Sequence, residues 1–146
     1  MIVRVDKDLI EKLVIFAHML WPEDSKEELK EDFYESLDLK NEQAFLYEMA
    51  DVGYIGFIQL SLRHDYVEGC DSSPVAYIEG IYVEEQYRRH GIAQELVKFA
   101  ESWGRERDCI ELASDCELEN NLSIDFHSGS GFTETNRLVC FKKDIK

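Results

Sequence analysis

Prolines and long apolar runs are scarce in this chain of 146 residues. It has only two prolines and no stretch rich in Pro, Gly or Ser, so the sequence indicates neither a linker nor an internal domain boundary. No apolar run has the length of a bilayer span, and the first residues lack the apolar core of a signal peptide. We therefore expect a single domain, residues 1–146, located in the cytoplasm, with no membrane as a partner.

Paired cysteines are also lacking. The four cysteines form no C-x-x-C pair, and no histidine lies at zinc-finger spacing from them. In a cytoplasmic protein this pattern is typical of free thiols in or near the core. We expect no metal site. Cys70 and Cys116 are poor candidates for acyl-carrying nucleophiles, because neither has a histidine partner in the sequence.

Basic residues are few: 16 stand against 31 acidic residues, which gives a formal charge of -15. A field of this sign repels phosphate backbones, so we expect no nucleic acid as a partner. The acidic excess has two interpretations. It serves solubility alone, or it draws a polycationic substrate into an acidic cleft.

Apolar residues are plentiful, at 45% of the chain, and their spacing predicts both strands and amphipathic helices. Asp6 is predicted to cap the first helix, Trp21-Pro22 to end it, and Ser25 to cap the second. A polar loop is expected over 64–74. The predicted strands are 2–5, 44–50, 54–63, 75–83, 110–114 and one or more within 133–143, and the predicted helices are 9–20, 25–37, 91–107 and 120–128.

The run Arg88-Arg89-His90-Gly91-Ile92-Ala93 lies directly between a predicted strand and a predicted helix. The first N–H groups of a helix have no partner within the helix, and the helix dipole favours an anion there. Gly91 allows close approach of a phosphate. Arginines at a helix start oppose the dipole, so an anion explains them better than helix stability does. We call residues 88–93 the phosphate cradle.

The cradle resembles the pyrophosphate-binding motif of the GNAT superfamily of N-acetyltransferases, whose pattern is Gln/Arg-x-x-Gly-x-Gly/Ala. The preceding Glu79-Gly80-Ile81-Tyr82-Val83 resembles the strand that pairs with the pantetheine arm of the cofactor, and Asn120 and Gly131-Phe132 are similar to the later cofactor segment. The resemblance implies an α+β fold, with a mixed, mostly antiparallel sheet flanked by helices and splayed at the central strands.

Five further stretches resemble the aminoglycoside 6′-N-acetyltransferases within this superfamily. Two of them, in the predicted loop over 64–74 and just before it, are not general GNAT features. The stretches are Leu20-Trp21-Pro22, Leu62-Arg63-His64-Asp65-Tyr66-Val67, Gly69-Cys70-Asp71-Ser72-Ser73-Pro74, Glu79-Gly80-Ile81 and Ala113-Ser114-Asp115.

The resemblance implies that acetyl-CoA is the co-substrate, that no metal takes part and that the enzyme is a homodimer. The backbone of the last residues of one strand would pair with the pantetheine, and the cradle would hold the pyrophosphate. The implied cofactor-binding residues are Ile81, Tyr82, Val83, Arg88, Arg89, His90, Gly91, Ile92, Ala93 and Asn120.

Acetyl transfer to an amine requires a neutral amine, a donor to the thioester oxygen and two aligned reactants. Glu79 lies inside an apolar run, where a charge is costly unless it is paired or used. Strand alternation predicts that it shares a face with Ile81. Glu79 is therefore one candidate catalytic residue. Asp115 is the other, because it ends the next predicted strand, where ligands gather in open sheets. The resemblance assigns the aminoglycoside, a polycationic amine, to Trp21, Tyr66, Glu79, Asp115 and Glu134.

His127 replaces a tyrosine that serves many GNAT enzymes as general acid. Two interpretations are equally open: a proton donor or a packed helix residue. For the chain as a whole, acetylation of protein N-termini or of small polyamines is the alternative activity. A non-catalytic acyl-CoA-binding module is a further alternative.

Overall fold

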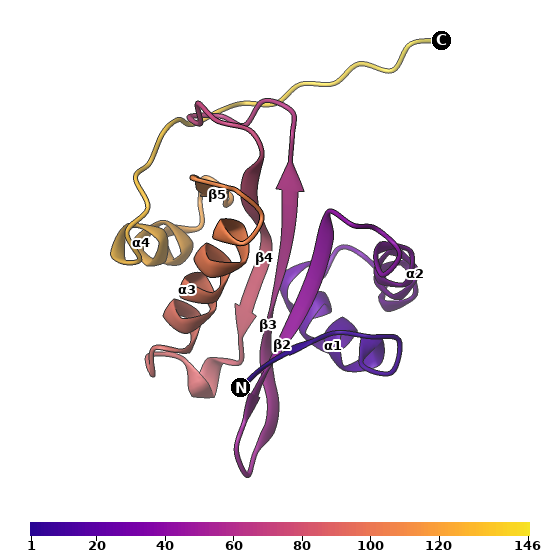
Figure 1. Ribbon diagram of the computed structural model, residues 1–146. Coiled ribbons are helices and arrows are strands. Elements are labelled where there is room, and N and C mark those ends of the chain that lie inside the picture. Colours follow the sequence, from indigo (N-terminus) through magenta and orange to yellow (C-terminus); the bar gives the residue numbers. More distant parts are fainter.

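A five-stranded sheet separates two layers of helices in the computed structural model, which describes residues 1–146 (Figure 1). In chain order the elements are β1 (Ile2–Arg4), α1 (Ile10–Leu20), α2 (Lys26–Ser36), β2 (Glu42–Met49), β3 (Gly53–Arg63), β4 (Val75–Val83), the short 3-10 helix η1 (Glu85–Tyr87), α3 (Ile92–Arg105), β5 (Leu112–Ser114) and α4 (Asn121–Gly129).

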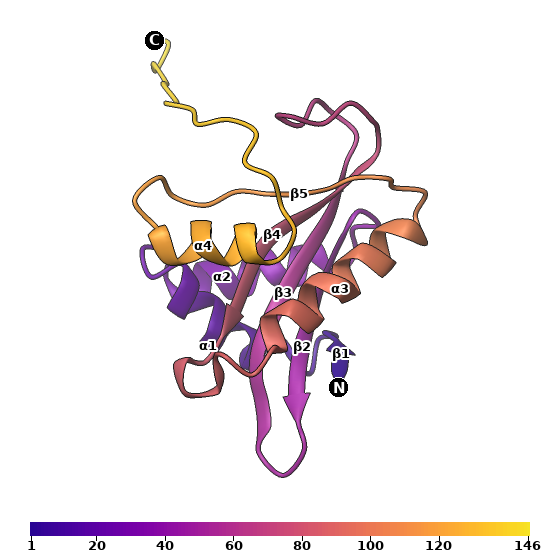
Figure 2. The same cartoon turned by 90° about the vertical axis from the view of Figure 1, so that its left-hand side faces the viewer.

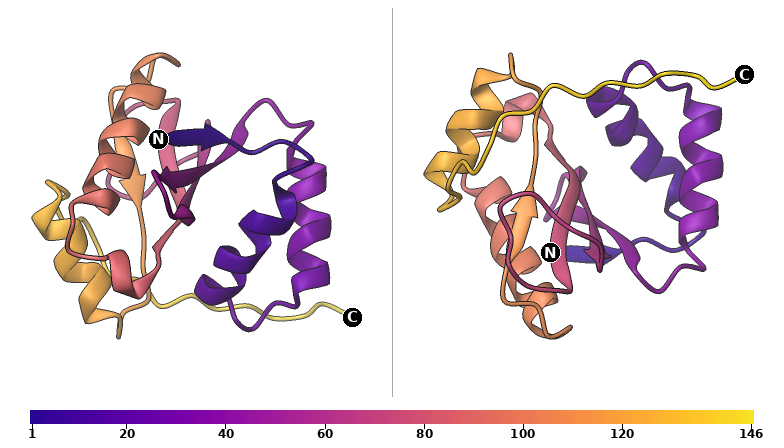
Figure 3. Two further views of the ribbon diagram at one scale, coloured as in Figure 1. Left: turned by 90° about the horizontal axis from the view of Figure 1, so that it is seen from below. Right: turned by 90° about the horizontal axis from the view of Figure 1, so that it is seen from above.

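The strands follow one another in chain order across the sheet, and only β5 runs parallel to its neighbour, β4. Helices α1 and α2 cover one face, whereas α3 and α4 lie on the other (Figure 3). The predicted α+β class with a mixed, mostly antiparallel sheet is confirmed. None of the helices has the length and apolar character that crossing a bilayer requires.

Two hydrophobic clusters hold the layers together. On one face Leu96 and Trp103 of α3 pack against the sheet, as the helical spacing predicted. On the other face Leu13 of α1 and Phe33 of α2 pack against Phe57 of β3. The sheet is therefore covered by apolar side chains on both faces, and the polar positions within it are exceptions.

The helix ends of the α1–α2 pair are set by their terminal residues. Trp21 ends α1, and the Ser25 side chain accepts a hydrogen bond from the Glu28 N–H at 3.1 Å, as predicted. The predicted cap at Asp6 is wrong, because α1 begins after Leu9. The Asp6 carboxylate instead accepts from the N–H of Asp8 at 2.9 Å and stabilises the turn before the helix.

A β-bulge interrupts the pairing of β3 with β4. Gln59 pairs with Gly80 and Leu60 with Ile78, so Glu79 has no partner on β3. Ile81 packs toward α3, but Glu79 faces the side of α1 and α2. The predicted shared face of Glu79 and Ile81 is therefore wrong, because the extra residue breaks the two-residue alternation.

The strands β4 and β5 stay together only briefly. Their pairing runs from Ala76 to Ile78 on β4 and involves three residues of β5. From Glu79 onward β4 has no strand on that side, and β5 leads away toward α4 (Figure 2). The predicted splay at the central strands is confirmed.

The C-terminal segment does not form the predicted strand within 133–143. The chain has no regular secondary structure after α4, and it extends away from the body of the molecule (Figures 1 and 2). Phe141 is 91% exposed, and Leu138 and Val139 are also exposed. The prediction is wrong for the single chain because a strand needs a neighbouring edge, and this segment lies beside none.

Candidate active site

The phosphate cradle lies at the N-terminus of α3, immediately after β4 and η1. Gly91 is the residue before the helix, with φ of 79°, and no side chain caps the helix. Arg89 also has a positive φ, 67°. The N–H groups of the first turn of α3 therefore remain open to an anion, as the sequence predicted.

The arginine at the start of the cradle ties it to the end of β4. Arg88 Nε donates to the carbonyl oxygen of Val83 at 2.7 Å, and its guanidinium lies 5.3 Å from the centre of the Tyr82 ring. The His90 ring lies 3.1 Å from the carbonyl oxygen of Tyr87. These contacts bring the predicted pantetheine strand, Ile81 to Val83, next to the predicted pyrophosphate site.

This arrangement fits a long nucleotide thioester. A Cβ added at Gly91 meets no atom within 4 Å, so the space before the open N–H groups is free. The neighbouring edge of β4 from Ile81 to Val83 has no strand beside it, and an extended arm can hydrogen-bond there. The phosphate cradle suits the phosphate end of acetyl-CoA, and the open edge of β4 suits its pantetheine arm.

A cavity of about 570 Å³ opens on the other face of β4. We call it the Glu79 cavity. Its lining is mainly polar, although it lies in the middle of the sheet. The lining residues are Trp21, Asn41, Glu42, Gln59, Ser61, Leu62, Arg63 and Glu79.

The Glu79 carboxylate is held by two residues of β3. Ser61 donates to Glu79 Oε2 at 2.5 Å. Arg63 donates from Nη2 to Oε1 at 2.8 Å and to Oε2 at 2.9 Å, and from Nε to Oε2 at 3.1 Å. The Glu79 side chain is 26% exposed, so a partly buried charge is paired here and still reaches the cavity.

Arg63 connects Glu79 to the second candidate catalytic residue. Its guanidinium carbon lies 3.4 Å from the centre of the Tyr77 ring, and the Tyr77 hydroxyl donates to Asp115. Burial acts to lower the pKa of Arg63, but bonding to Glu79, with smaller contributions from Tyr77 and Asp115, raises it overall. Burial and the bond to Asp115 raise the pKa of Tyr77. Both predicted carboxylates thus belong to one network.

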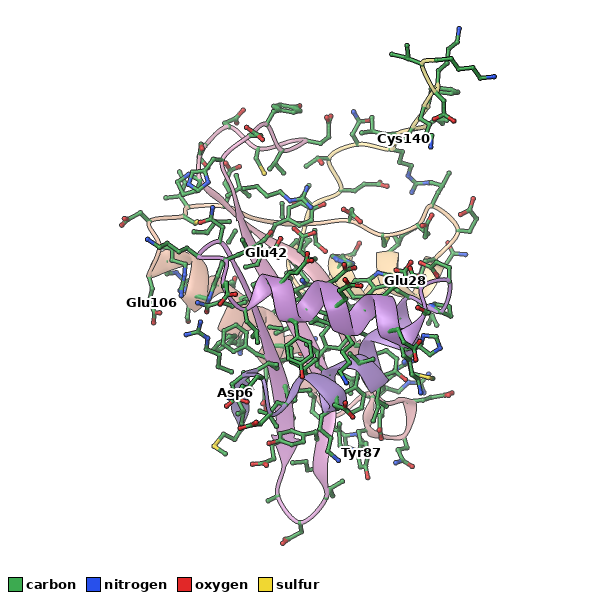
Figure 4. All side chains as sticks on the ribbon, turned by 90° about the vertical axis from the view of Figure 1, so that its right-hand side faces the viewer. Asp6, Glu28, Glu42, Tyr87, Glu106 and Cys140 are labelled. Atoms are coloured by element: carbon green, nitrogen blue, oxygen red, sulfur yellow. The ribbon has the colours of Figure 1, made fainter.

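Sequence reasoning missed Glu42, at the start of β2. Its carboxyl group lines the cavity, and burial, with a smaller contribution from Glu79, raises its pKa. Glu42 lies near one end of α2 in Figure 4. A signal was present in the neighbouring strand, where Gln59, Ser61 and Arg63 place a polar side chain at every second position of an otherwise apolar run.

Trp21, which the resemblance assigns to the substrate, lies in the cavity wall. Its ring meets that of Phe57 edge-on, with 6.0 Å between the centroids. The ring passes so close to β4 that a Cβ at Gly80 would lie 2.6 Å from Trp21 Cη2. Gly80 is therefore the residue that lets the indole lie across the strand beside Glu79.

Tyr66 and Glu134 lie outside the cavity lining. The Tyr66 side chain is 78% exposed, and its hydroxyl donates to Glu68. Glu134 pairs with Arg137 at 2.5 Å. Both belong to one region, because Asn136 donates to Glu68 at 2.8 Å and joins the C-terminal segment to the loop after β3. Trp21 and Glu79 thus line the cavity, and Asp115 lies outside it but is linked to Glu79 through Tyr77 and Arg63. Tyr66 and Glu134 have neither connection.

Asn120 and His127 both have roles within α4. Asn120 caps the helix by accepting from the Ser123 N–H at 3.1 Å. His127 Nδ1 lies 2.7 Å from the Ser123 carbonyl oxygen, and Nε2 lies 2.8 Å from Ser114 Oγ. Both ring nitrogens therefore already have partners within the protein. The geometry therefore favours a packed histidine over a proton donor.

Comparisons with known proteins agree with this geometry. The model of the Acetyltransferase (GNAT) family matches residues 13–132. The aminoglycoside N(6′)-acetyltransferase type 1 of Serratia marcescens is 38% identical over 145 residues, which cover 99% of each chain. The enzyme of the same name from Acinetobacter genomosp. 13 is 39% identical over 145 residues, 99% of this chain and 98% of that one.

Solved structures show the same likeness. AAC(6′)-Iy in complex with the bisubstrate analogue CoA-S-monomethyl-acetylneamine superposes with a TM-score of 0.93 at 37% identity, over 99% of this chain and 98% of that one. The apo aminoglycoside 6′-N-acetyltransferase AAC(6′)-IG from Acinetobacter haemolyticus gives a TM-score of 0.94 at 33% identity, over 100% and 99%. With an open phosphate cradle, a splayed sheet and these relatives, the chain belongs to the acetyltransferase (GNAT) family.

Proposed function

We propose that this protein transfers the acetyl group of acetyl-CoA to the 6′-amino group of aminoglycosides. One observation carries the proposal: β4 has an anion-binding cradle and an open edge on one side and the Glu79 cavity on the other. A nucleotide thioester and a polycationic amine can therefore approach the same strand from opposite sides. The relatives named for this activity support the choice of substrate.

The cofactor end of the proposed site is basic. Arg88, Arg89 and His90 would surround the pyrophosphate, and the backbone N–H groups of Gly91, Ile92 and Ala93 would bind it. The backbone of Ile81 to Val83 would pair with the pantetheine, and one N–H there would polarise the thioester oxygen. Asn120, at the start of α4, would contact the cofactor further along.

The substrate end is acidic. A neutral amine attacks the thioester carbonyl carbon, the C–N bond forms as the C–S bond breaks, and a proton is transferred to the departing sulfur. Glu79 and Asp115 would bind the amine and take up its proton directly or through a water. Trp21 and Tyr66 would offer flat faces to sugar rings and cations, and Glu134 a further carboxylate.

Thiol release from acetyl-CoA tests the proposal. We expect turnover with kanamycin or tobramycin, and none with an aminoglycoside that has a hydroxyl group in place of the 6′-amine. Activity on spermidine or on a peptide N-terminus alone would favour another acetyltransferase activity. Acetyl-CoA binding by calorimetry without turnover of any amine would indicate a binding module. In cells, the activity would give resistance to 6′-amino aminoglycosides, acting in the cytoplasm.

The proposed enzyme is a homodimer. The C-terminal segment carries exposed apolar side chains, with Phe141 91% and Ile145 97% exposed, and it has no strand partner in its own chain. A second copy would cover this segment. Light scattering should give twice the chain mass of 17.1 kDa, and substitution of Leu138 and Phe141 by Asp should return the monomer mass. A monomeric parent protein would contradict the dimer.

A further inference from the structure

The Glu79 cavity contains a cation of the protein itself. Arg63 is the one basic residue in the lining, and it bonds both oxygens of Glu79. Its guanidinium is stacked on Tyr77, which in turn bonds Asp115. The cation therefore lies between the two carboxylates to which the proposed function assigns the substrate amine.

An acidic site for an amine has an inherent conflict. Carboxylates attract the ammonium form, but the same attraction raises the pKa of the amine and holds it in the form that cannot attack. An alkyl amine already has a pKa of roughly 10 in water. Glu42, Glu79 and Asp115 alone would therefore strengthen binding and slow the chemical step.

We propose that Arg63 is a positioning residue that offsets the charge of Glu79 and Asp115, so that a substrate amine bound at Glu79 loses its proton before attack. This inference rests on the proposed function and deepens it. The ammonium group becomes a neutral amine, and its proton leaves through water in the cavity to the solvent. Arg63 keeps its own proton throughout, because the pKa of a guanidinium is far above neutral pH.

The hydrogen bonds leave one place for the amine. Three of the four bonds to the Glu79 carboxylate end on Oε2, and only Arg63 Nη2 bonds to Oε1. A carboxylate oxygen has about two lone pairs, so Oε1 retains an acceptor site. An amine that donates to Oε1 lies beside the guanidinium, where a second positive charge is unfavourable.

Charged groups from every neighbouring element act on this position. Glu42 lines the cavity from β2, whereas Asp115, which follows β5, lies outside the lining and bonds Tyr77, on which Arg63 is stacked; both charges favour the ammonium form. Asp24 and Asp32 line an adjoining cavity beside α2 that shares Trp21 and Glu42 with this one. Arg63 acts against all of them, and it is the nearest to Glu79.

Three variants test the proposal. Arg63→Met removes the cation and keeps much of the aliphatic stem, whereas Arg63→Lys keeps a positive charge. Arg107→Met is the matched control, because Arg107 is likewise stacked on an aromatic ring, 4.2 Å from the centre of Trp103, but lies outside the cavity. Arg107→Met changes the net charge of the protein by the same amount as Arg63→Met. Neither arginine side chain belongs to the buried core, since that of Arg63 is 41% exposed and that of Arg107 27%, so we expect all three proteins to fold.

We expect Arg63→Met to lower both kcat and KM for kanamycin at saturating acetyl-CoA. A shift of one unit in the pKa of the bound amine changes its neutral fraction, and hence kcat below that pKa, by about ten-fold. The acid limb of the kcat profile should move to higher pH, Arg63→Lys should recover much of kcat, and Arg107→Met should match the parent.

Two results would overturn the proposal. One is an unchanged kcat in Arg63→Met. The other is a lower kcat together with a higher KM, because that combination indicates a distorted site that binds kanamycin less tightly.

Proton release distinguishes this inference from the proposed function. Kanamycin binding is measured by calorimetry in two buffers of different ionisation enthalpy, which gives the number of protons released per ligand bound. The parent should release more protons than Arg63→Met, and Arg63→Lys should resemble the parent. Equal proton release in the parent and in Arg63→Met overturns the role of Arg63, even if acetyl transfer is observed. Absence of acetyl transfer overturns the proposed function, even if proton release differs between the two proteins.

Discussion

Substituting Gly80 by Ala should push Trp21 out of the wall of the Glu79 cavity. The added Cβ would lie 2.6 Å from Trp21 Cη2, 2.7 Å from Cζ2 and 3.0 Å from Leu20 Cδ2. Carbon atoms normally approach to about 3.5–4.0 Å, so the ring must move by roughly 1 Å. The backbone is not strained, because Gly80 does not have a positive φ. The substitution therefore isolates one steric contact.

The expected cost follows from the packing of the indole. Trp21 is held edge-on against Phe57, so its ring cannot turn freely. Overpacking of this kind costs about 1–3 kcal/mol, and each kcal/mol lowers Tm by about 2–4 °C in a protein of this size. Because the displaced ring also lines the cavity, KM for kanamycin should rise. KM for acetyl-CoA should stay the same, because its proposed site lies on the other side of β4.

Differential scanning calorimetry and steady-state kinetics measure the two effects. Gly129→Ala is the matched control, because a Cβ there meets nothing within 4 Å. It should leave both KM values unchanged and raise stability by up to about 1 kcal/mol. In a protein that already has Trp21→Leu, Gly80→Ala should lower Tm by less than it does in the parent, because the clashing ring is absent. Parental Tm and kanamycin KM in Gly80→Ala would refute the reasoning.

Three further outcomes are expected. Glu42→Gln should raise KM for kanamycin several-fold and leave KM for acetyl-CoA unchanged; equal effects on both would remove Glu42 from the substrate end. Gly91→Ala, which places a side chain at φ of 79°, should cost about 1 kcal/mol in urea unfolding and raise KM for acetyl-CoA only. The fold raises the pKa of Tyr77 above its ordinary value of 10.0, which means that the protonated hydroxyl stabilises the folded state. This stabilisation is complete below pH 10.0 and is lost as the pH rises above that value. Urea unfolding between about pH 8 and 11 should therefore show a smaller alkaline loss in Tyr77→Phe, and equal slopes would contradict the burial of its hydroxyl.

The elements that depend on local pattern could be predicted from the sequence. The bounds of β4 were predicted to the residue, and α3 begins one residue after the predicted start at Gly91. The cradle was also predictable, because its chemistry needs only a strand, a glycine turn and a helix in sequence order. The proposed acetyl-CoA side of the site could thus be predicted from a single short stretch of chain.

The substrate side depends on pairing between distant strands, which periodicity does not reveal. Glu42 approaches Glu79 only because Glu42 pairs with Ser61 and Ser61 bonds Glu79. The C-terminal strand failed for a related reason: the sequence shows the apolar residues of a strand, but not whether an edge is present to receive it. Contacts between elements, and contacts between copies of the chain, are set by the whole fold.

The bulge at Glu79 joins these two levels. Ile78 packs toward α3, and Glu79 follows it by regular alternation to the side of α1 and α2, with Trp21, Ser61 and Arg63. The extra residue then returns Ile81 to the side of α3, at the point where β5 leaves β4 and the edge opens. In the proposed site, one short strand would thus present its backbone to a thioester and a carboxylate to an amine. The prediction that Glu79 and Ile81 share a face fails because the bulge lies between these two side chains and breaks the two-residue alternation.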